Sequence, residues 1–256
     1  MTTQGRLNRG DGVEVAWTLQ PGRGPTVVFL PGFRSDMAGI KGTELAALGA
    51  ATGQAVLRLD YSGHGISSGA FTDGTIGRWT DDAGAVIDAI APGPLLLVGS
   101  SMGGWIALML TLARPHRVTA VVGIAAAPDF TERLMWQSMA PRERDILTRT
   151  GRLEVPSQYG EPLTIMRTLI EEGRNHLLLD APIAIHCPVR LLQGQQDPDV
   201  PWETALTLMA KLESTDVQVT LIKDGDHRLS RPEDLALLGR TVAALLTQNS
   251  AQPLAV

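Results

Sequence analysis

A serine between two glycines is the first feature of this sequence that could do chemistry. Residues 99–103 are GSSMG, with the apolar run LLLV before them and WIALMLTLA after them. This pattern is typical of a strand that turns at once into a helix and raises the serine clear of the sheet. The free N–H groups at the start of that helix favour negative charge beside the serine. The sequence therefore predicts that Ser101 is a nucleophile.

A second match to the same G-x-S-x-G pattern lies at residues 65–69, GISSG. It follows the polar turn YSGH and leads into AFTDG, which is not the start of an apolar helix. The surroundings therefore favour Ser101 as the nucleophile, and we expect Gly65–Gly69 to be a loop.

A serine hydroxyl needs a base to take its proton. His227 follows VQVTLI, the last apolar run that has strand character, and is the histidine best placed to be that base. The others are predicted to be surface or capping residues: His64, His116, His176 and His186.

A carboxylate must hold the imidazole in the useful tautomer. The segment LLQGQQDPDVP at residues 191–201 offers Asp197 and Asp199, which are both chemically suitable. Asp197 is favoured because it lies closer to the end of the predicted strand. The chain order Ser101, Asp197, His227 is one of the known orders of a catalytic triad.

Two backbone N–H groups are candidates to stabilise the oxyanion of an acyl-transfer reaction. One belongs to Met102, directly after the nucleophile, and the other to Phe33, in the loop that follows the run TVVFL. Gly32 lets the backbone of that loop approach the substrate closely. A site of this kind needs no cofactor and no metal.

The elements that must position these groups alternate between short apolar runs and longer helical segments. Such alternation predicts an α/β fold with a mostly parallel sheet covered by helices on both faces. Strands are expected at 13–19, 26–30, 55–59, 95–98, 118–124, 189–192 and 217–222, and helices at 41–52, 75–91, 102–113, 202–212 and 232–248.

The alternation stops between Asp129 and about Pro182, where no run has convincing strand character. We expect residues 129–182 to form a helical lid between two parts of the core, 1–128 and 183–256. Its helices are expected at Phe130–Met139 and around Leu163–Ile170. The alternative is a pair of ordinary packing helices. The Met and Leu residues of this region fit an acyl pocket and the interior of a lid equally well.

Composition limits the possible partners and locations. The 256 residues carry a net charge of −5, which gives no reason to expect nucleic acid as a partner. The single cysteine, Cys187, fits a reducing compartment. No signal-like or 18-residue apolar stretch occurs, so we expect a cytoplasmic protein without stable membrane insertion. The sequence leaves its oligomeric state open.

Several of these stretches together resemble the α/β-hydrolase superfamily, and more narrowly the α/β-hydrolase domain-containing protein ten family. That family includes a mitochondrial acyl-protein thioesterase, also described as an acyl-glucuronide esterase. The resemblance rests on LPGFRSDMAGIKG from residue 30, RLDYSGHGISSG from 58, VGSSMGGW from 98, ARPHRV from 113, CPVRLLQGQQDPDVPW from 187 and DHR from 226.

The resemblance implies that Ser101, Asp197 and His227 form the triad, and that the family's aspartate aligns with Asp197. It also implies that Phe33 and Met102 supply the oxyanion hole. Two features depart from the family. Pro31-Gly32 stands where many α/β-hydrolases carry His-Gly, although close relatives also have proline there. No transit peptide is visible, so mitochondrial targeting is not carried over.

The sequence predicts a serine hydrolase that cleaves carboxylic esters or acyl thioesters through an acyl-enzyme, with a small-molecule or acylated substrate. Two alternatives stay open: a carbon–carbon bond hydrolase of the same fold, and a non-catalytic small-molecule receptor built on a hydrolase scaffold.

Overall fold

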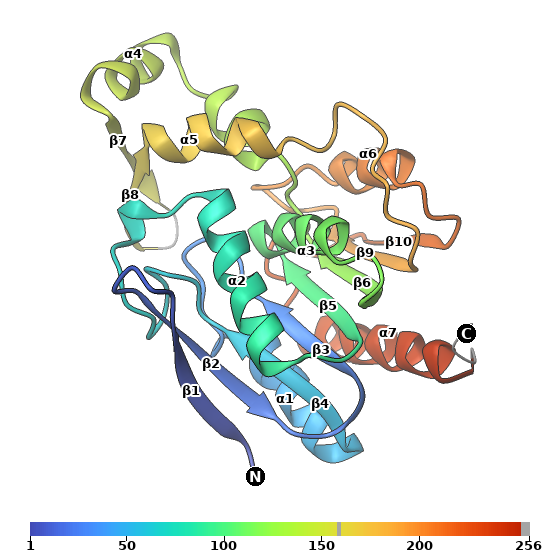
Figure 1. Cartoon of the computed structure of the whole chain (residues 1–256). Helices are drawn as coiled ribbons and strands as arrows, with labels where there is room; N and C mark the ends of the chain where they lie inside the picture. Colours follow the sequence, from blue (N-terminus) through green and yellow to red (C-terminus); the bar gives the residue numbers. More distant parts are fainter. Residues whose placement is uncertain (158–159, 252–256) are drawn as a thin grey trace.

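A computed structural model describes residues 1–157 and 160–251. Within these residues an eight-stranded sheet runs through the centre of the molecule (Figure 1). β2 pairs antiparallel with both β1 and β4, and all the other neighbouring strands are parallel. The predicted α/β fold is therefore confirmed. The order across the sheet is β1 (Thr3–Asn8), β2 (Glu14–Gln20), β4 (Gln54–Leu59), β3 (Arg23–Leu30), β5 (Leu95–Ser100), β6 (Val118–Ile124), β9 (Val189–Gly194) and β10 (Val217–Ile222).

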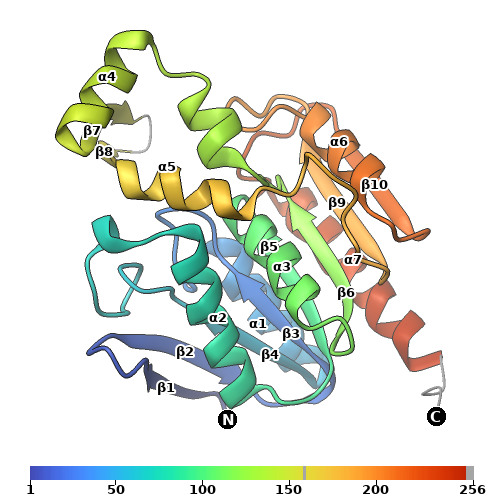
Figure 2. The ribbon, with the colours of Figure 1, turned by 45° about the horizontal axis from the view of Figure 1, so that its top comes forward.

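Helices cover both faces of the sheet (Figures 1 and 2). One core cluster joins alternate strand residues to the helices α2 (Ile76–Ile90), α3 (Met102–Ala113) and α6 (Glu203–Lys211). The other joins the intervening strand residues to α1 (Ile40–Thr52) and α7 (Pro232–Ala251). Leu97 belongs to the first cluster and Leu96 to the second. A strand buried on both faces needs apolar residues throughout, which explains why β5 begins with LLLV.

The strand β1 was not predicted, because its sequence TQGRLN lacks apolar alternation. It lies at the edge of the sheet and pairs with β2 in register from Thr3 opposite Leu19 to Asn8 opposite Glu14. Its residues are exposed or half-buried. Backbone pairing therefore holds most of this strand, and among its side chains Leu7 packs against the main core cluster.

The region 129–182 differs from the prediction that it is all-helical. It contains a π-helix, η2 (Thr131–Trp136), and the helices α4 (Pro141–Thr150), α5 (Arg167–Gly173) and η3 (Arg174–His176). Between α4 and α5, however, the strands β7 (Arg152–Ser157) and β8 (Gly160–Met166) form an antiparallel hairpin. The predicted helix around Leu163–Ile170 is wrong over its first four residues. Leu153 and Ile165 face each other across this hairpin and are buried against Leu147 of α4.

Hydrogen bonds join the two ends of this region to each other and fix it to the core. The buried Asp129 carboxylate accepts the N–H groups of Leu178 and Leu179 at 2.8 and 2.9 Å, which joins the two ends of the segment. The Trp105 indole of α3 donates to the carbonyl of His176 at 3.1 Å. Glu172 of α5 accepts the N–H of Gly77, near the start of α2, at 3.1 Å. That the region acts as a lid, and that the chain divides into 1–128, 129–182 and 183–256, stay predictions.

No helix in the described part of the chain combines the length and the apolar character that crossing a membrane requires.

Candidate active site

Ser101 occupies a sharp turn between β5 and α3. Its backbone has φ 54° and ψ −118°, a conformation that a residue with a side chain adopts only when its surroundings enforce it. Three backbone hydrogen bonds hold Ser101 in this conformation. The Ser101 N–H donates to Ile124 O at 2.8 Å, and the Ser101 carbonyl accepts the N–H groups of Gly104 and Ala127. The predicted strand–turn–helix arrangement around Ser101 is present.

The flanking glycines make this turn possible by their small size. A Cβ on Gly99 would lie 2.1 Å from the carbonyl oxygen of Gly103, and a Cβ on Gly103 would lie 2.0 Å from that of Leu30. Both contacts are with backbone, which has little room to move. The turn therefore requires glycine at both positions of G-x-S-x-G.

The second G-x-S-x-G match, Gly65–Gly69, is a loop as predicted. Ser67 donates its hydroxyl proton to Asp60 O at 2.7 Å and accepts the N–H of Ala16 at 2.8 Å. This hydroxyl joins the loop to β2 and therefore has a structural role.

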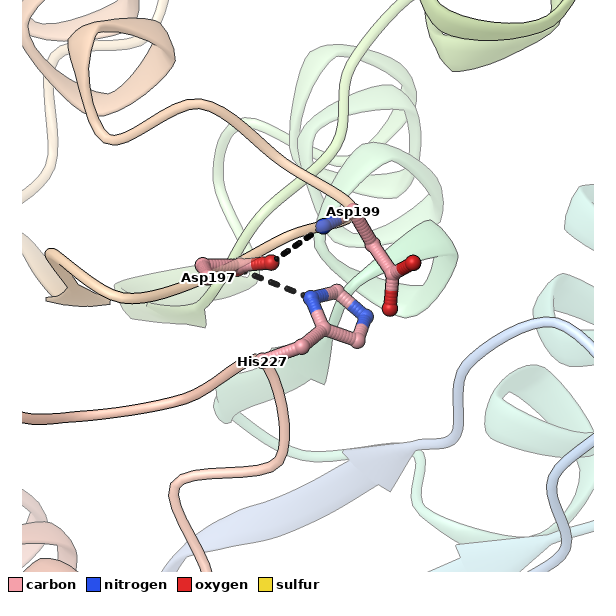
Figure 3. A group of neighbouring side chains, drawn as sticks. All are labelled: Asp197, Asp199 and His227. Atoms are coloured by element: carbon pink, nitrogen blue, oxygen red, sulfur yellow. Dashed lines mark hydrogen bonds and ion pairs between the residues drawn. The ribbon is translucent and has the colours of Figure 1, made fainter. Parts of the chain in front are cut away.

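The structure brings Asp197 and His227 together (Figure 3). Asp197 follows β9 and His227 follows β10, and His227 Nδ1 lies 2.8 Å from Asp197 Oδ2. The Asp197 side chain is 0% exposed and that of His227 is 18% exposed. Burial alone would raise the pKa of Asp197, but the hydrogen bond and charge of His227, with two backbone N–H groups, outweigh it and hold this pKa below its usual range.

Three further donors fix the Asp197 carboxylate. The N–H groups of Asp199 and Val200 donate to Oδ1 at 2.8 and 2.9 Å, and Gln193 Nε2 donates to Oδ2 at 3.0 Å. These contacts distinguish the positions of the two candidate aspartates, and the choice of Asp197 as the triad carboxylate stays a prediction. Asp197 bonds the imidazole directly, whereas Asp199 supports Asp197 through its backbone N–H.

Asp199 nevertheless lies close to the pair. Ligand atoms of Asp197, Asp199 and His227 lie within 4.8 Å of one another, so these side chains form a group that could hold a metal ion (Figure 3). The proton between His227 and Asp197 would have to leave before an ion could bind both atoms. The arrangement suits a proton-transfer pair at least as well as a metal site.

Ser101, Asp197 and His227 all lie at one edge of the sheet, because each follows the carboxyl end of a parallel strand. Ligands of open α/β sheets bind at this edge. The hydrogen bond between Ser101 and His227 stays a prediction.

The predicted oxyanion loop lies against the nucleophile. A Cβ on Gly32 would be 3.2 Å from Ser100 O and 3.3 Å from Ser101 Cβ, so the backbone at residue 32 runs beside Ser101. Met102 is the first residue of α3. The roles of the Phe33 and Met102 N–H groups as oxyanion donors stay predictions.

An aromatic cluster surrounds the Phe33 side chain and was not found by sequence reasoning. The ring centroids of Phe71, Trp79 and Phe130 lie 5.0, 5.8 and 5.6 Å from that of Phe33. Trp105 contacts Phe130 in turn, at 5.8 Å. These five residues come from separate segments, so no local sequence pattern could have joined them.

His64 was predicted to be a surface or capping residue, and this is wrong. Only 3% of its surface is exposed, and its ring lies edge-on to three aromatic rings, Tyr61, Phe71 and Trp79. His116 is exposed, as expected, and the side chain of His186 is 69% exposed. His176 is half-buried beside Glu172.

A cavity of about 370 Å³ opens beside the predicted oxyanion loop, residues 31–37. Its lining is mixed, with hydroxyl, charged and apolar groups from this loop, the loop after β4, the short helix η1 (Phe71–Asp73) and the strand β8. The lining residues are Arg34, Ser35, Asp36, Gly63, His64, Gly65, Phe71, Thr72, Pro162, Leu163 and Thr164.

The Met and Leu residues of region 129–182 are involved in packing. Leu134, Met135 and Met166 contact the main core cluster, and Met139 is buried in a separate cluster with Leu147. Leu163, however, lines the cavity as well as packing against this separate cluster, so both interpretations of the Met and Leu residues stay open.

Comparison with known proteins gives consistent similarities. A family model described as "Alpha/beta hydrolase family" matches residues 27–236. The human protein named "Palmitoyl-protein thioesterase ABHD10, mitochondrial" is 37% identical over 246 residues, which are 95% of this chain and 80% of that protein.

Two solved structures are also similar over nearly their whole length. Mouse α/β-hydrolase domain-containing protein 10 has a TM-score of 0.90 at 36% identity, over 96% of this chain and 99% of that one. A protein from Agrobacterium vitis S4 has a TM-score of 0.91 at 43% identity, over 96% and 98% of the two chains.

Proposed function

Because the chain belongs to the alpha/beta hydrolase family, we propose that it is a serine hydrolase that cleaves carboxylic esters or acyl thioesters. Ser101 is the nucleophile, His227 the general base and acid, and Asp197 the residue that orients His227. The N–H groups of Phe33 and Met102 form the oxyanion hole.

The reaction proceeds in two halves. Ser101 Oγ attacks the acyl carbonyl carbon while its proton passes to His227 Nε2, and the tetrahedral oxyanion accepts hydrogen bonds from the two N–H groups. Collapse breaks the bond to the leaving alcohol or thiol, which takes the proton from His227. Water then attacks the acyl-enzyme with His227 again as base, and Ser101 is regenerated.

The observation that carries this proposal is the pairing of His227 with a buried carboxylate. Asp197 Oδ2 accepts from Nδ1 at 2.8 Å, so in the neutral imidazole the proton is on Nδ1 and Nε2 is the atom that can take one from a hydroxyl. An imidazole held in this tautomer, at the sheet edge that presents a strained serine, has the components of nucleophilic acyl transfer.

The choice between ester and thioester rests on the names of relatives. The mammalian proteins that are 36 to 38% identical to this chain are named palmitoyl-protein thioesterases. We therefore propose an acyl thioester as the first substrate class to test. A chain-length series of acyl esters and matching acyl thioesters, assayed on the purified protein, separates the two activities.

A fluorophosphonate probe tests the nucleophile itself. Ser101→Ala should abolish both labelling and ester cleavage, and His227→Ala should abolish cleavage. Ser67→Ala is the matched control, since it removes a hydroxyl from the same five-letter pattern and should keep the labelling. Labelling that is lost with Ser67 and kept with Ser101→Ala would contradict the proposal.

The cellular location and partners are proposed on separate grounds. The single cysteine is compatible with a reducing compartment, and the cytoplasm remains our expected location. The names of the mammalian relatives place those proteins in mitochondria. The expected partner is a small-molecule or acylated substrate, and the net charge of −5 gives no support for nucleic acid.

A further inference from the structure

The loop that carries the predicted oxyanion donor is held by the segment Asp60–His64, which directly follows β4. Near the start of the oxyanion loop, the Tyr61 hydroxyl donates to Pro31 O at 3.1 Å. Near its end, Asp60 Oδ1 accepts the N–H of Met37 at 2.7 Å. Both contacts are buried, so the loop is fixed on either side of Phe33.

The contact nearest to Phe33 is made by His64. The Arg34 N–H donates to His64 Nε2 at 3.3 Å, and His64 Nδ1 lies 3.2 Å from Ser62 O. A carbonyl only accepts, so Nδ1 carries the proton, and Nε2 is the acceptor. His64 is therefore the neutral Nδ1–H tautomer. Burial lowers the pKa of His64, which favours this neutral form.

The segment that holds His64 is itself fixed to α2. Asp82 Oδ2 accepts the N–H of Ser62 at 2.9 Å, and the Trp79 indole donates to Ser62 O at 3.1 Å. Both side chains are fully buried. The position of His64 is thus set by a core helix and does not depend on a flexible loop.

The oxyanion loop needs such support because of its backbone conformation. Ser35 N–H donates to Gly32 O at 3.0 Å, which closes a four-residue turn with Phe33 and Arg34 at its centre. Arg34 has φ 58°, where a turn usually has glycine. The hydrogen bond that closes the turn does not involve the N–H groups of Phe33 and Arg34, its two central residues. His64 accepts the N–H of Arg34.

We propose that His64 is a positioning residue for the oxyanion hole: by accepting the Arg34 N–H it holds the turn so that the Phe33 N–H faces the substrate oxygen. Tyr61 and Asp60 hold the same loop at its two ends. The inference rests on the proposed function, because it takes Phe33 as the donor. The segment DYSGH, which contributes no group to the proposed mechanism, would then affect the rate by positioning the oxyanion donor.

Two amide substitutions separate positioning from packing. The carboxamide of glutamine reaches the place of Nε2, so His64→Gln keeps an acceptor for the Arg34 N–H. The shorter asparagine reaches only the place of Nδ1, so His64→Asn keeps the contact to Ser62 and loses the one to Arg34. Both replace the ring by an amide, and they therefore share the loss of aromatic contacts. His186→Gln, at an exposed histidine, is the control for the substitution itself.

The expected readout is a change in kcat with little change in KM, because the oxyanion contact forms in the transition state. Loss of one oxyanion donor lowers kcat by about 10²–10³-fold, so a misplaced donor in His64→Asn should lower it by about 10- to 100-fold. His64→Gln should stay within about 3-fold of the wild type on the same argument. Affinity for an acyl trifluoromethyl ketone, which forms a tetrahedral adduct, should fall in parallel with kcat.

Equal impairment of the two amide variants, or a wild-type kcat in His64→Asn, would overturn the proposal. If His64→Asn does not fold, Tyr61→Phe carries the test, since it removes only the hydroxyl that donates to Pro31. It should lower kcat with KM unchanged, and a wild-type kcat there would also overturn the proposal. Ser101→Ala keeps the two proposals distinct. Full turnover by that variant would contradict the serine mechanism. An inactive Ser101→Ala together with a wild-type kcat in His64→Asn would contradict only the positioning role of His64.

Discussion

Replacing Asp197 by asparagine should inactivate the enzyme without unfolding it. The carboxylate accepts from four donors: two backbone N–H groups at Oδ1, and Gln193 Nε2 and His227 Nδ1 at Oδ2. An asparagine has a single oxygen. The two backbone donors cannot turn away, so they require that oxygen at the Oδ1 position.

The amide nitrogen must then occupy the Oδ2 position and donate to both side chains. Gln193 can accept from that nitrogen only if its amide rotates, which turns Oε1, without a hydrogen-bond partner among the described residues, toward position 197 and gives up the Nε2 bonds to Val200 O and Gly194 O. His227 can adapt only by accepting at Nδ1, which moves its proton to Nε2. In that tautomer it cannot take the proton of Ser101.

A triad whose histidine is held in the wrong tautomer loses about 10⁴-fold in kcat. At about 1.4 kcal/mol for each factor of ten, this corresponds to about 5 kcal/mol of transition-state stabilisation. The substitution keeps the volume of the side chain and, after these adjustments, a hydrogen bond to each of its four neighbours, so the melting temperature should change little.

The assay is hydrolysis of a p-nitrophenyl ester, with Asp199→Asn as the matched variant. Asp199 contributes a backbone N–H to Asp197, which the substitution leaves intact, so this variant should stay within about 10-fold of the wild type. An Asp197→Asn enzyme that keeps more than a tenth of its activity, or an Asp199→Asn enzyme that is the more impaired, would refute the assignment of Asp197.

Three further predictions concern stability and reactivity. Gly103→Ala should lower the melting temperature by about 6–12 °C, because its Cβ would lie 2.0 Å from Leu30 O, while Gly93→Ala, with nothing within 4 Å, should change it little. Cys187 should react slowly with iodoacetamide at pH 8 until urea is added, because burial raises its pKa to about 11. Burial lowers the pKa of Lys41 to about 8 in the folded chain, from 10.5. Between these values the unfolded chain binds more protons, so the unfolding free energy measured in urea should rise with pH relative to that of Lys41→Met; a flat difference would contradict this.

The core strands and helices were predictable from the sequence because they are buried on a regular period. The strands at Val118–Ile124 and Val217–Ile222 and the helix at Met102–Ala113 coincide with the predicted ranges. The strand Val118–Ile124 and the helix Met102–Ala113 are buried over most of their length, and in the strand Val217–Ile222 the residues Val217, Val219 and Ile222 are half-buried. In each element the local apolar pattern agrees with the burial in the fold.

The hairpin β7–β8 was missed because two patterns compete there. Leu163, Met166, Leu169 and Ile170 have the spacing of an apolar helix face. The structure uses the alternation of Leu163 and Ile165 instead, and the helix begins only at Arg167. Pairing with β7, which the single segment does not reveal, decides in favour of the strand.

The pairing of His64 with Arg34 was beyond sequence reasoning for a different reason. A histidine in the polar loop DYSGHG has no apolar pattern that indicates burial. Its burial follows from Phe71 and Trp79, which reach it from later segments of the chain. A polar residue whose neighbours are distant in sequence is the case in which local pattern fails.

The two G-x-S-x-G segments show what the letters themselves specify. In residues 99–103 the strain falls on Ser101, at φ 54°, and neither glycine has a positive φ. In residues 65–69 the glycines take the left-handed conformation, at φ 50° for Gly65 and φ 96° for Gly69, and Ser67 does not. Glycine thus serves close packing in the first segment, whereas the second uses its backbone freedom and, at Gly65, also its small size beside Asp60. The pattern permits a raised serine, but only a buried strand before it and a packed helix after it place the strain on that serine.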